Sequence, residues 1–346
     1  MSDKREKRNL IIPVFIPNQG CPYQCVYCQQ EKITNQSGTP VNASSIAHIL
    51  DTALAYPGFN NIQRREIAFY GGTFTRLGSD RMIELLEAAA PYIQNGSFHS
   101  IRISTRPDEI DKRRLDLLKR YNVATVELGI QSMDNEVLKR SGRGHSSEDT
   151  VKAINILGEF GFNIGAQLMP GLPGDSEEKF KNTIDKILDL KPHMARLYPA
   201  IVIKGTVLER WYRDDRYTPL TLEKAVKICC ESCDLLEKNG IKVIRIGLMS
   251  SPSLLRKGQI VAGPWHRSFG FLVRSNMHLD RIMPFLPKPG EAKRIGIRTA
   301  PREIPLTRGF KNQGLRTIEE KCKVKIAYVK PDNSVPSGRI EVDVIE

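Results

Sequence analysis

The sequence predicts an α/β protein, with a partial (β/α)6-type barrel over residues 1–250 and a small basic α/β extension over 251–346. Short runs rich in Ile and Val alternate with stretches whose apolar residues recur at helical spacing. Such alternation over about 240 residues implies a parallel sheet that is buried on both faces. Six or more strand–helix units favour a barrel, complete or partial, over an open doubly wound sheet.

The expected elements follow one another along the first 250 residues. Helices are expected after Asn42, after Ser146 with Asp149 as a capping box, after Asp175 or Ser176, and after Thr221. The expected strands are 9–16, 66–70, 100–104, 123–130, 162–169, 194–202 and 242–248. Chemistry in such folds lies at the carboxyl ends of the strands, where the polar and glycine-bearing motifs of this chain fall.

The last 96 residues have a different character. A loop-like stretch is followed by a short helical insert at 263–275. Strands are expected at 293–299, 323–329 and 338–345, with a helix at 316–322 before the second of them.

Composition and charge narrow the class of protein. The 346 residues contain no apolar run near the roughly 18 residues that a membrane-spanning helix needs. The basic N-terminus lacks a small-residue cleavage site and contains Pro13, so a signal peptide is not expected. A cytoplasmic location follows as an expectation, and there the seven cysteines suggest metal, redox or packing roles.

The net charge of +13 is concentrated at the two ends of the chain. Residues 251–346 hold 18 Lys and Arg against 9 Asp and Glu, a net +9. A second cluster consists of Lys4, Arg5, Lys7 and Arg8. Such a distribution is typical of a polyanion-binding protein, with RNA as the expected partner, although a solvated surface without a partner gives the same pattern.

Three cysteines, Cys21, Cys25 and Cys28, form a C-x3-C-x2-C pattern just after the first expected strand. Structural zinc needs four ligands, and no second pair with suitable spacing is evident. A thioredoxin-like pair would leave Cys21 unexplained, and the polar loop context disfavours core packing. Three thiolates on a 4Fe–4S cluster leave one iron open for an exogenous ligand, so the cluster is the favoured interpretation.

The triplet, with Tyr27 as the aromatic residue before its last cysteine, resembles the signature of radical S-adenosylmethionine (radical SAM) enzymes. Further motifs fall at successive strand ends. "YGGTF" (70–74) resembles the family's glycine turn, and "MPGLPG" (169–174) resembles its turn against adenine. The resemblance implies that the cofactor is contacted by Tyr27, Gly71, Gly72, Thr73, Ser104, Gln131 and Arg143.

Within that superfamily, residues 8–250 resemble the radical domain of elongator protein 3, the catalytic subunit of Elongator. The resemblance rests on "GGTF", "TRPD", "VELGIQSMDNEVLKRSGRGH" and the segment 196–221. Two departures stand out. Ser104 replaces the family's usual Glu, and no acetyltransferase-like domain is expected in the last 96 residues, which makes use of acetyl-CoA doubtful.

The resemblance implies binding of a 4Fe–4S cluster and cleavage of S-adenosylmethionine to methionine and a 5′-deoxyadenosyl radical. It also implies a reductant such as flavodoxin or ferredoxin, and RNA (tRNA or rRNA) as the substrate. Tyr198, Lys204 and Arg245 are candidates for contacts with a substrate anion, or else are ordinary surface and packing residues. A small-molecule or tetrapyrrole enzyme resembling oxygen-independent coproporphyrinogen oxidase, and a cluster protein without turnover, remain alternatives.

Overall fold

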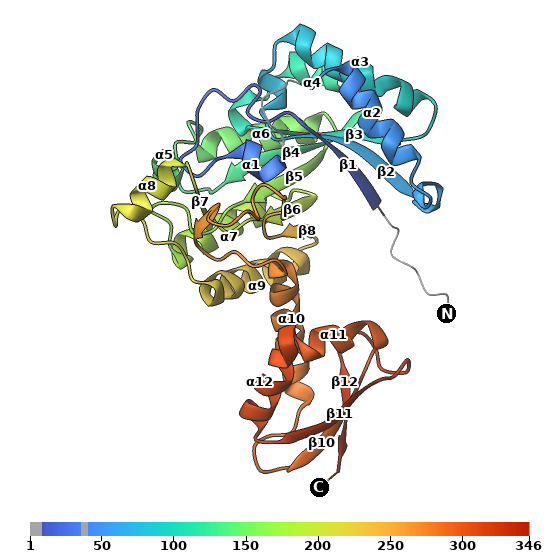
Figure 1. The fold of residues 1–346 in the computed structure, drawn as a ribbon, viewed down its shortest axis with the longest axis vertical. Helices are drawn as coiled ribbons and strands as arrows, with labels where there is room; N and C mark the ends of the chain where they lie inside the picture. Colours follow the sequence, from blue (N-terminus) through green and yellow to red (C-terminus); the bar gives the residue numbers. More distant parts are fainter. Residues whose placement is uncertain (1–8, 36–40, 346) are drawn as a thin grey trace. The chain divides into compact units, whose positions relative to one another are not determined.

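The computed structural model describes residues 9–35 and 41–345. By contact the chain divides into two compact units (Figure 1). Unit 1 comprises residues 1–221 and 236–265, and unit 2 comprises residues 222–235 and 266–346.

Unit 1 is built on a seven-stranded sheet in the order β1-β2-β3-β4-β5-β6-β8, in which every neighbouring pair is parallel. The sheet ends at β1 and β8, so the prediction of a partial barrel is confirmed. The strands are β1 (Asn9–Phe15), β2 (Arg64–Tyr70), β3 (Ser100–Thr105), β4 (Val123–Gln131), β5 (Asn163–Leu168), β6 (Met194–Leu197) and β8 (Lys242–Ile246).

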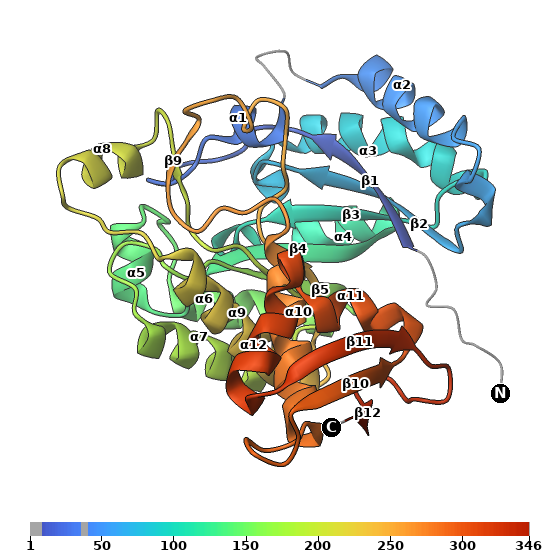
Figure 2. The same cartoon turned by 60° about the horizontal axis from the view of Figure 1, so that its bottom comes forward.

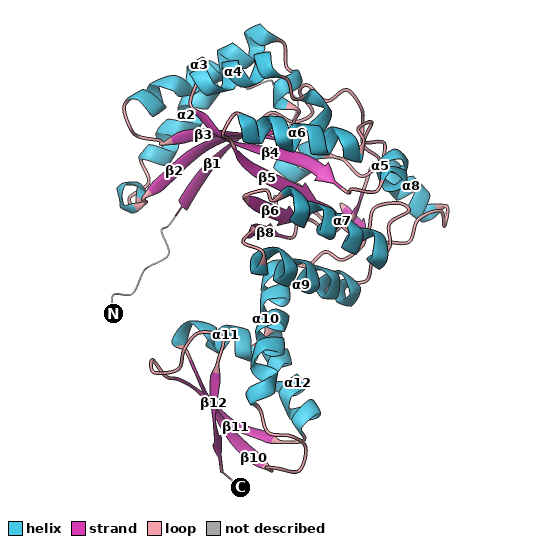
Figure 3. Ribbon diagram, turned by 180° about the vertical axis from the view of Figure 1, so that it is seen from behind, coloured by secondary structure: helices cyan, strands magenta, loops and turns pink. Residues whose placement is uncertain are grey.

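Helices cover the outer face of this sheet (Figure 3). They are α2 (Ala43–Leu54), α3 (Ser79–Gln94), α4 (Lys112–Arg120), α6 (Ser147–Glu159) and α7 (Glu177–Leu190). Side chains alternate between the two faces of a strand, and the residues that meet the helices, such as Ile67, Phe69 and Ile103, are fully buried. The opposite face carries polar residues, including Glu127 and Arg196, and bounds the site described below.

Helix starts follow the expected capping chemistry. Asn42 and Ser146 each accept a hydrogen bond from the backbone of the third helical residue, and both form capping boxes, which confirms those two predictions. Ser176, rather than Asp175, caps α7. Shorter elements complete the unit: α1 (Gln30–Thr34), α5 (Asn135–Arg140), α8 (Val207–Arg213) and the antiparallel pair β7 (Val202–Ile203) and β9 (Ile260–Ala262).

Unit 2 contains the three expected strands in one sheet, ordered β11-β10-β12. Its elements are α10 (Phe269–Ile282), β10 (Arg294–Thr299), α11 (Ile304–Arg308), α12 (Gln313–Cys322), β11 (Lys325–Pro331) and β12 (Ile340–Val344). The insert predicted at 263–275 is instead a helix that begins at Phe269 and runs on to Ile282, because Met277, Leu279 and Ile282 continue its buried face. The remaining helix is α9 (Leu222–Lys238), and no helix in the described ranges is long and apolar enough to span a membrane.

Candidate functional site

A cavity of about 450 Å³ lies within unit 1 on the polar face of the sheet. Its walls come from all seven strands of the parallel sheet and from segments that follow them. All three cysteines of the triplet line this cavity, as do all seven residues expected to contact the cofactor. The structure therefore brings together motifs that are more than a hundred residues apart in sequence.

The cysteine-bearing loop between β1 and α1 is held by backbone hydrogen bonds from two other segments. The Val26 amide donates to the Ser141 carbonyl at 3.1 Å, and the Val26 carbonyl accepts from the Leu208 amide at 2.8 Å. Within the loop, the Cys28 amide donates to the Cys25 carbonyl at 3.0 Å. These contacts fix the loop against the end of α5 and the first turn of α8, so its thiols have a set position in the cavity wall.

The environment of the thiols fits an iron–sulfur cluster that is bound through thiolates. Cys25 is buried, and its Sγ accepts from Nη1 of Arg143 at 3.3 Å, while Cys21 Sγ lies 3.5 Å from Thr73 Oγ1. Burial, with the charges of Cys25 and Cys21, raises the pKa of Cys28 to about 12. Three thiolates packed together need bound cationic iron for their stabilisation.

The described residues contain no group of three His, Cys, Asp or Glu side chains arranged to hold a single metal ion. A 4Fe–4S cluster makes a different demand, because each thiolate binds a separate iron of the cluster. The donor set therefore suits the cluster.

The glycine turn after β2 has a structural role that the sequence did not reveal. Gly71 has a φ of +95°, and its carbonyl accepts from the Asn18 amide at 2.8 Å. A Cβ on Gly72 would lie 2.4 Å from the Gln19 carbonyl oxygen and 2.8 Å from that of Ile16. The two glycines thus allow the segment that leads into the cysteine loop to pack directly on the end of β2.

Gln131 lies at an irregularity in β4. The register with β5 shifts between Leu128 and Gln131, and Gln131 has a left-handed φ of 67°. This conformation is uncommon for a residue other than glycine, and such outliers cluster at functional sites. The Gln131 side chain is buried in the cavity wall, and its Oε1 accepts no hydrogen bond from the residues that the structure describes.

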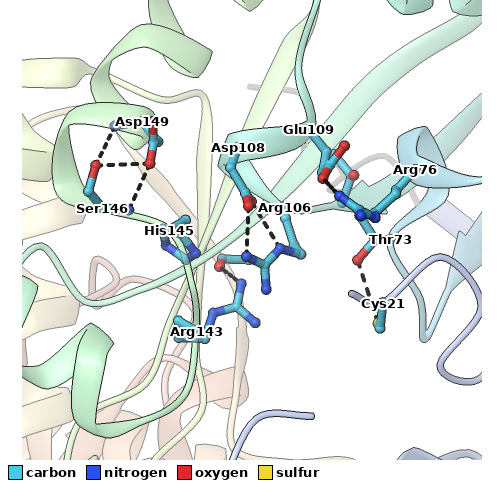
Figure 4. A network of polar contacts seen from close by, with 12 residues as sticks. Cys21, Thr73, Arg76, Arg106, Asp108, Glu109, Arg143, His145, Ser146 and Asp149 are labelled. Atoms are coloured by element: carbon cyan, nitrogen blue, oxygen red, sulfur yellow. Dashed lines mark hydrogen bonds and ion pairs between the residues drawn. The ribbon is translucent and has the colours of Figure 1, made fainter. Parts of the chain in front are cut away.

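Arg143 and Arg106 lie close to the ends of β3 and β4, beside His145 (Figure 4). Arg106 forms two hydrogen bonds with Asp108, at 2.9 and 2.8 Å, whereas Arg143 contacts Cys25 and the Gly129 carbonyl. Burial, together with these two cations, lowers the pKa of His145 to about 2, so the imidazole is neutral. The positive charge of this corner therefore resides on the two arginines.

Unpartnered buried polar atoms mark where a ligand is expected. Tyr27 Oη, Gln131 Oε1 and Arg143 Nε have no hydrogen-bond partner within the described part of the chain, although all three residues line the cavity. A buried polar atom without a partner costs about 1–3 kcal/mol, so a polar ligand that satisfies these atoms would recover it. The amino, carboxylate and ribose groups of S-adenosylmethionine supply partners of the required kinds.

An ionic network on the strands borders the cavity, and the sequence reading missed it. Glu127 Oε1 accepts from Arg102 Nη1 at 2.6 Å, and its Oε2 lies 2.7 Å from Arg196 Nε. Tyr70 Oη donates to Glu127 at 2.8 Å. Although burial by itself lowers the pKa of Arg196, the charges of Tyr198 and Glu127 raise it above its ordinary value. The charged residues within otherwise apolar strands were the feature of the sequence that could have predicted this network.

Two of the three residues predicted to contact a substrate anion line the cavity, and the third does not. Tyr198 lines the cavity and accepts from Arg196 Nη1 at 3.0 Å, and Arg245 also lines it. Lys204 is exposed and lies outside the cavity lining, where its carbonyl accepts from Lys32 at 2.6 Å. The basic residues Lys4, Arg5, Lys7 and Arg8 lie outside the described residues.

Two known protein families match this chain. The sequence pattern of the radical SAM superfamily matches residues 15–187, half of the chain, and that of the radical SAM C-terminal domain matches residues 192–278. The chain belongs to the radical SAM superfamily. Radical SAM membership implies a 4Fe–4S cluster and S-adenosylmethionine as its cofactors.

Curated relatives share part of this chain. A tRNA uridine(34) acetyltransferase of Methanocaldococcus infernus is 36% identical over 139 residues, which are 39% of this chain and 26% of the relative. That of Dehalococcoides mccartyi is 29% identical over 58% of this chain and 50% of the relative. The heme chaperone HemW of Lactococcus lactis is 27% identical over 69% of this chain and 62% of the relative. The chain thus spans between about a quarter and a half of the length of the acetyltransferases.

A solved structure of Elp3 from Methanocaldococcus infernus aligns with a TM-score of 0.62 and 24% identity. The alignment covers 79% of this chain and 63% of the Elp3 chain. At this level of identity the likeness shows a shared fold. The predicted resemblance to the radical domain of elongator protein 3 is confirmed by these relatives.

Proposed function

We propose that this radical SAM enzyme modifies an RNA, with tRNA as the substrate class. The observation that carries the proposal is the polar wall of the cavity beyond the cysteine loop, where Gln167, Arg196 and Tyr198 supply hydrogen-bond donors and acceptors. A nucleobase presents several such groups on its edge. A site built to hydrogen-bond these groups discriminates strongly against analogues that lack them.

The relatives and the charge of the chain support the same substrate class. Two of the relatives described above are named as tRNA uridine(34) acetyltransferases, and their names specify tRNA and not rRNA. The net charge of +13 favours a polyanionic partner. The use of acetyl-CoA is not part of the proposal.

The proposed roles of the residues follow from their positions. Cys21, Cys25 and Cys28 would hold the cluster, which when bound to S-adenosylmethionine supplies a 5′-deoxyadenosyl radical for hydrogen abstraction. Gln131, Tyr27 and Arg143 would orient the cofactor through their unpartnered atoms. Tyr198 and Arg196 would position the substrate, and the cavity wall would keep water from the radical.

Tyr198 has a defined orientation because Arg196 donates to its hydroxyl oxygen. Arg196 is in turn held by Glu127. The Tyr198 hydroxyl group, which we propose positions the substrate, is therefore held in place by residues of the ionic network on the strands.

Nucleoside mass spectrometry of separately purified tRNA and rRNA, from a deletion strain and its parent, tests the substrate class. We expect a modified nucleoside to disappear from the tRNA fraction and to return with the wild-type gene. Unchanged tRNA nucleosides would refute the proposal, and a loss confined to rRNA would redirect it to that RNA.

A Cys25→Ala variant tests the chemistry independently of the substrate. We expect it to lose both the visible absorbance of the cluster and the release of 5′-deoxyadenosine from S-adenosylmethionine. Cys322→Ala, the same substitution in the core of unit 2, is the matched control and should retain both properties. A Cys25→Ala protein that retained both would disprove the cluster assignment.

The similarity to HemW favours one second candidate, a function with a tetrapyrrole. Haem binding by the purified protein, with no change in tRNA nucleosides in the deletion strain, would support that candidate over RNA modification.

A further inference from the structure

Unit 2 has its own core and an arrangement of elements that suits nucleic-acid binding. Leu279, Ile295, Ile297, Ile318 and other apolar residues form one buried cluster between the helices and one face of the sheet. β10 and β11 are parallel neighbours, and α11 and α12 connect them (Figure 2). The order is strand, helix, turn, helix, strand, with β12 antiparallel on the other side of β10.

The charge of unit 2 is positive, and part of that charge lies at the turn between α11 and α12. Residues 266–346 contain 16 Lys and Arg against 9 Asp and Glu, a net +7. On the sheet, the single residue Arg298 pairs with three carboxylates, at 2.9, 2.7 and 3.1 Å. These carboxylates belong to Asp332, Glu341 and Asp343. Among the described residues, these three carboxylates pair with Arg298 and with no cation of α11 or α12.

Three cations that have no ion-pair partner in the described ranges lie at or beside the turn between α11 and α12: one ends α11, one lies in the turn and one lies in the first part of α12. Arg308, Lys311 and Arg316 are exposed, and none of the three takes part in an ion pair within the described part of the chain. Lys311 Nζ lies 5.6 Å from the centre of the Phe310 ring, and Arg316 donates to the side chain of Gln313 at 3.0 Å. Long cationic side chains without carboxylate partners are available to phosphates.

An aromatic pair lies at the same turn. The rings of Phe310 and His266 are 4.7 Å apart in an edge-to-face arrangement, and both residues are partly exposed. Proteins that bind single-stranded RNA combine cations that follow the backbone with aromatic faces on which bases stack. The turn presents both kinds of group within a few residues.

The shape of the turn is fixed by close packing. A Cβ on Gly314 would lie 2.3 Å from the Thr307 carbonyl oxygen, so only glycine allows α12 to approach the end of α11 this closely. Lys311 and Asn312 both have left-handed backbone conformations, with φ of 51° and 61°. In KH modules a Gly-x-x-Gly loop clamps the backbone of four nucleotides. The segment Lys311–Gly314 spans the end of the turn and the first two residues of α12, with a left-handed lysine at its first position and glycine at its last.

From these three cations, the aromatic pair and the fixed turn, we propose that the α11–α12 turn of unit 2 binds single-stranded RNA, with Arg308 and Lys311 on phosphates and Phe310 stacked against a base. The proposal rests on the proposed function, in that it supplies the binding surface for the RNA substrate. Unit 2 would then hold a single-stranded segment of the RNA while the cavity of unit 1 carries out the chemistry.

Fluorescence anisotropy with a labelled 12-nucleotide single-stranded RNA and the full-length protein, over a series of salt concentrations, tests the proposal. We expect the double variant Arg308→Glu/Lys311→Glu to bind at least ~10-fold more weakly. Its log K against log[salt] slope should be smaller by about 1.4, because each phosphate contact to a single strand contributes about 0.7. A duplex of the same sequence should bind more weakly than the single strand.

The matched control is Lys288→Glu/Lys293→Glu, which makes the same change in charge before β10 rather than after it. We expect this control to keep the slope of the wild type. Phe310→Leu preserves an apolar side chain but removes the aromatic face, and we expect it to weaken binding ~10-fold with no change in slope, since stacking involves no counterion release.

The outcomes separate the two proposals. Equal losses for the two charge-reversal pairs, or a preference for the duplex, would overturn the proposed surface and leave the proposed function standing. RNA binding that is lost in Arg308→Glu/Lys311→Glu, together with unchanged tRNA nucleosides in the deletion strain, would support the surface and refute the proposed modification. Both charge-reversal variants should release 5′-deoxyadenosine like the wild type, which verifies that unit 1 is intact.

Discussion

Replacement of Glu127 by Gln tests whether the ionic network on the strands holds the partial barrel together. The carboxylate of Glu127 contacts Arg102 at 2.6 Å, Arg196 at 2.7 Å and the Tyr70 hydroxyl at 2.8 Å. Gln has nearly the same shape but no charge. Arg102 would retain Glu66 at 2.5 Å, whereas Arg196 would lose its only carboxylate partner among the described residues.

The expected loss of stability is large because the network is buried. Glu127 and Arg102 side chains are 4% and 6% exposed, so solvent cannot replace the lost partner. Opposite charges about 4 Å apart interact by about 4 kcal/mol at an effective dielectric constant near 20. Removal of one partner of a buried pair typically costs about 3–5 kcal/mol, and we expect the free energy of unfolding of unit 1 to fall by that amount.

Urea unfolding of the full chain, followed by tryptophan fluorescence, measures this change. The two tryptophans of the sequence, Trp211 and Trp265, both belong to unit 1, so the signal reports this unit. Glu136→Gln is the matched control, because Glu136 pairs with Arg140 on the surface of α5, where both side chains are more than half exposed. That pair is worth only about 0.3–0.5 kcal/mol. Equal shifts for Glu127→Gln and Glu136→Gln would refute the proposed structural role of the network.

Three further predictions concern the site and its surroundings. Gly72→Ala should displace the segment before the cysteine loop and greatly reduce cluster content, measured by visible absorbance after anaerobic reconstitution. Gly78 has open space around it, so Gly78→Ala is the control and should retain the cluster content of the wild type. Equal cluster content in the two variants would contradict the packing role of Gly72. Arg143→Met should lower the rate of 5′-deoxyadenosine release ~10–100-fold, because a donor to a cluster thiolate is lost, and Arg140→Met on the exposed face of α5 should leave the rate near that of the wild type. Burial raises the pKa of Asp175 to about 6, so the folded protein binds this proton more tightly than the unfolded chain. Unit 1 should therefore lose stability as the pH rises from about 4 to about 6, and urea midpoints of Asp175→Asn should show a smaller loss over that range; identical pH profiles would exclude the titration of Asp175.

Local patterns in the sequence predicted most of the fold of unit 1. Six of the seven expected strands of the parallel sheet are present with ends that differ by two residues at most, because a strand that is buried on both faces has a short apolar sequence. The run 194–202 was expected as one strand, but β6 ends at Leu197, and Val202 belongs to the separate strand β7. The caps at Asn42 and Ser146 could also be predicted from the sequence, since they depend on residues only three positions apart. The length of α10 could not be predicted, because its apolar face is completed by contacts with strands that follow later in the chain.

The sequence by itself determined the family and the chemistry. The spacing of Cys21, Cys25 and Cys28 is local, and the cofactors follow from the family that this spacing indicates. Only the tertiary structure decided which charges remain available. Arg102, Arg196 and Arg298 look like free cations in the sequence, but each is paired with carboxylates from other segments of the chain. Arg308 and Lys311 have no such partner among the residues that the structure describes. The physical reason is that two opposite charges pair only when they lie within a few ångströms of each other. The residues that pair are far apart in sequence, so the distance between their charges is known only from the folded structure.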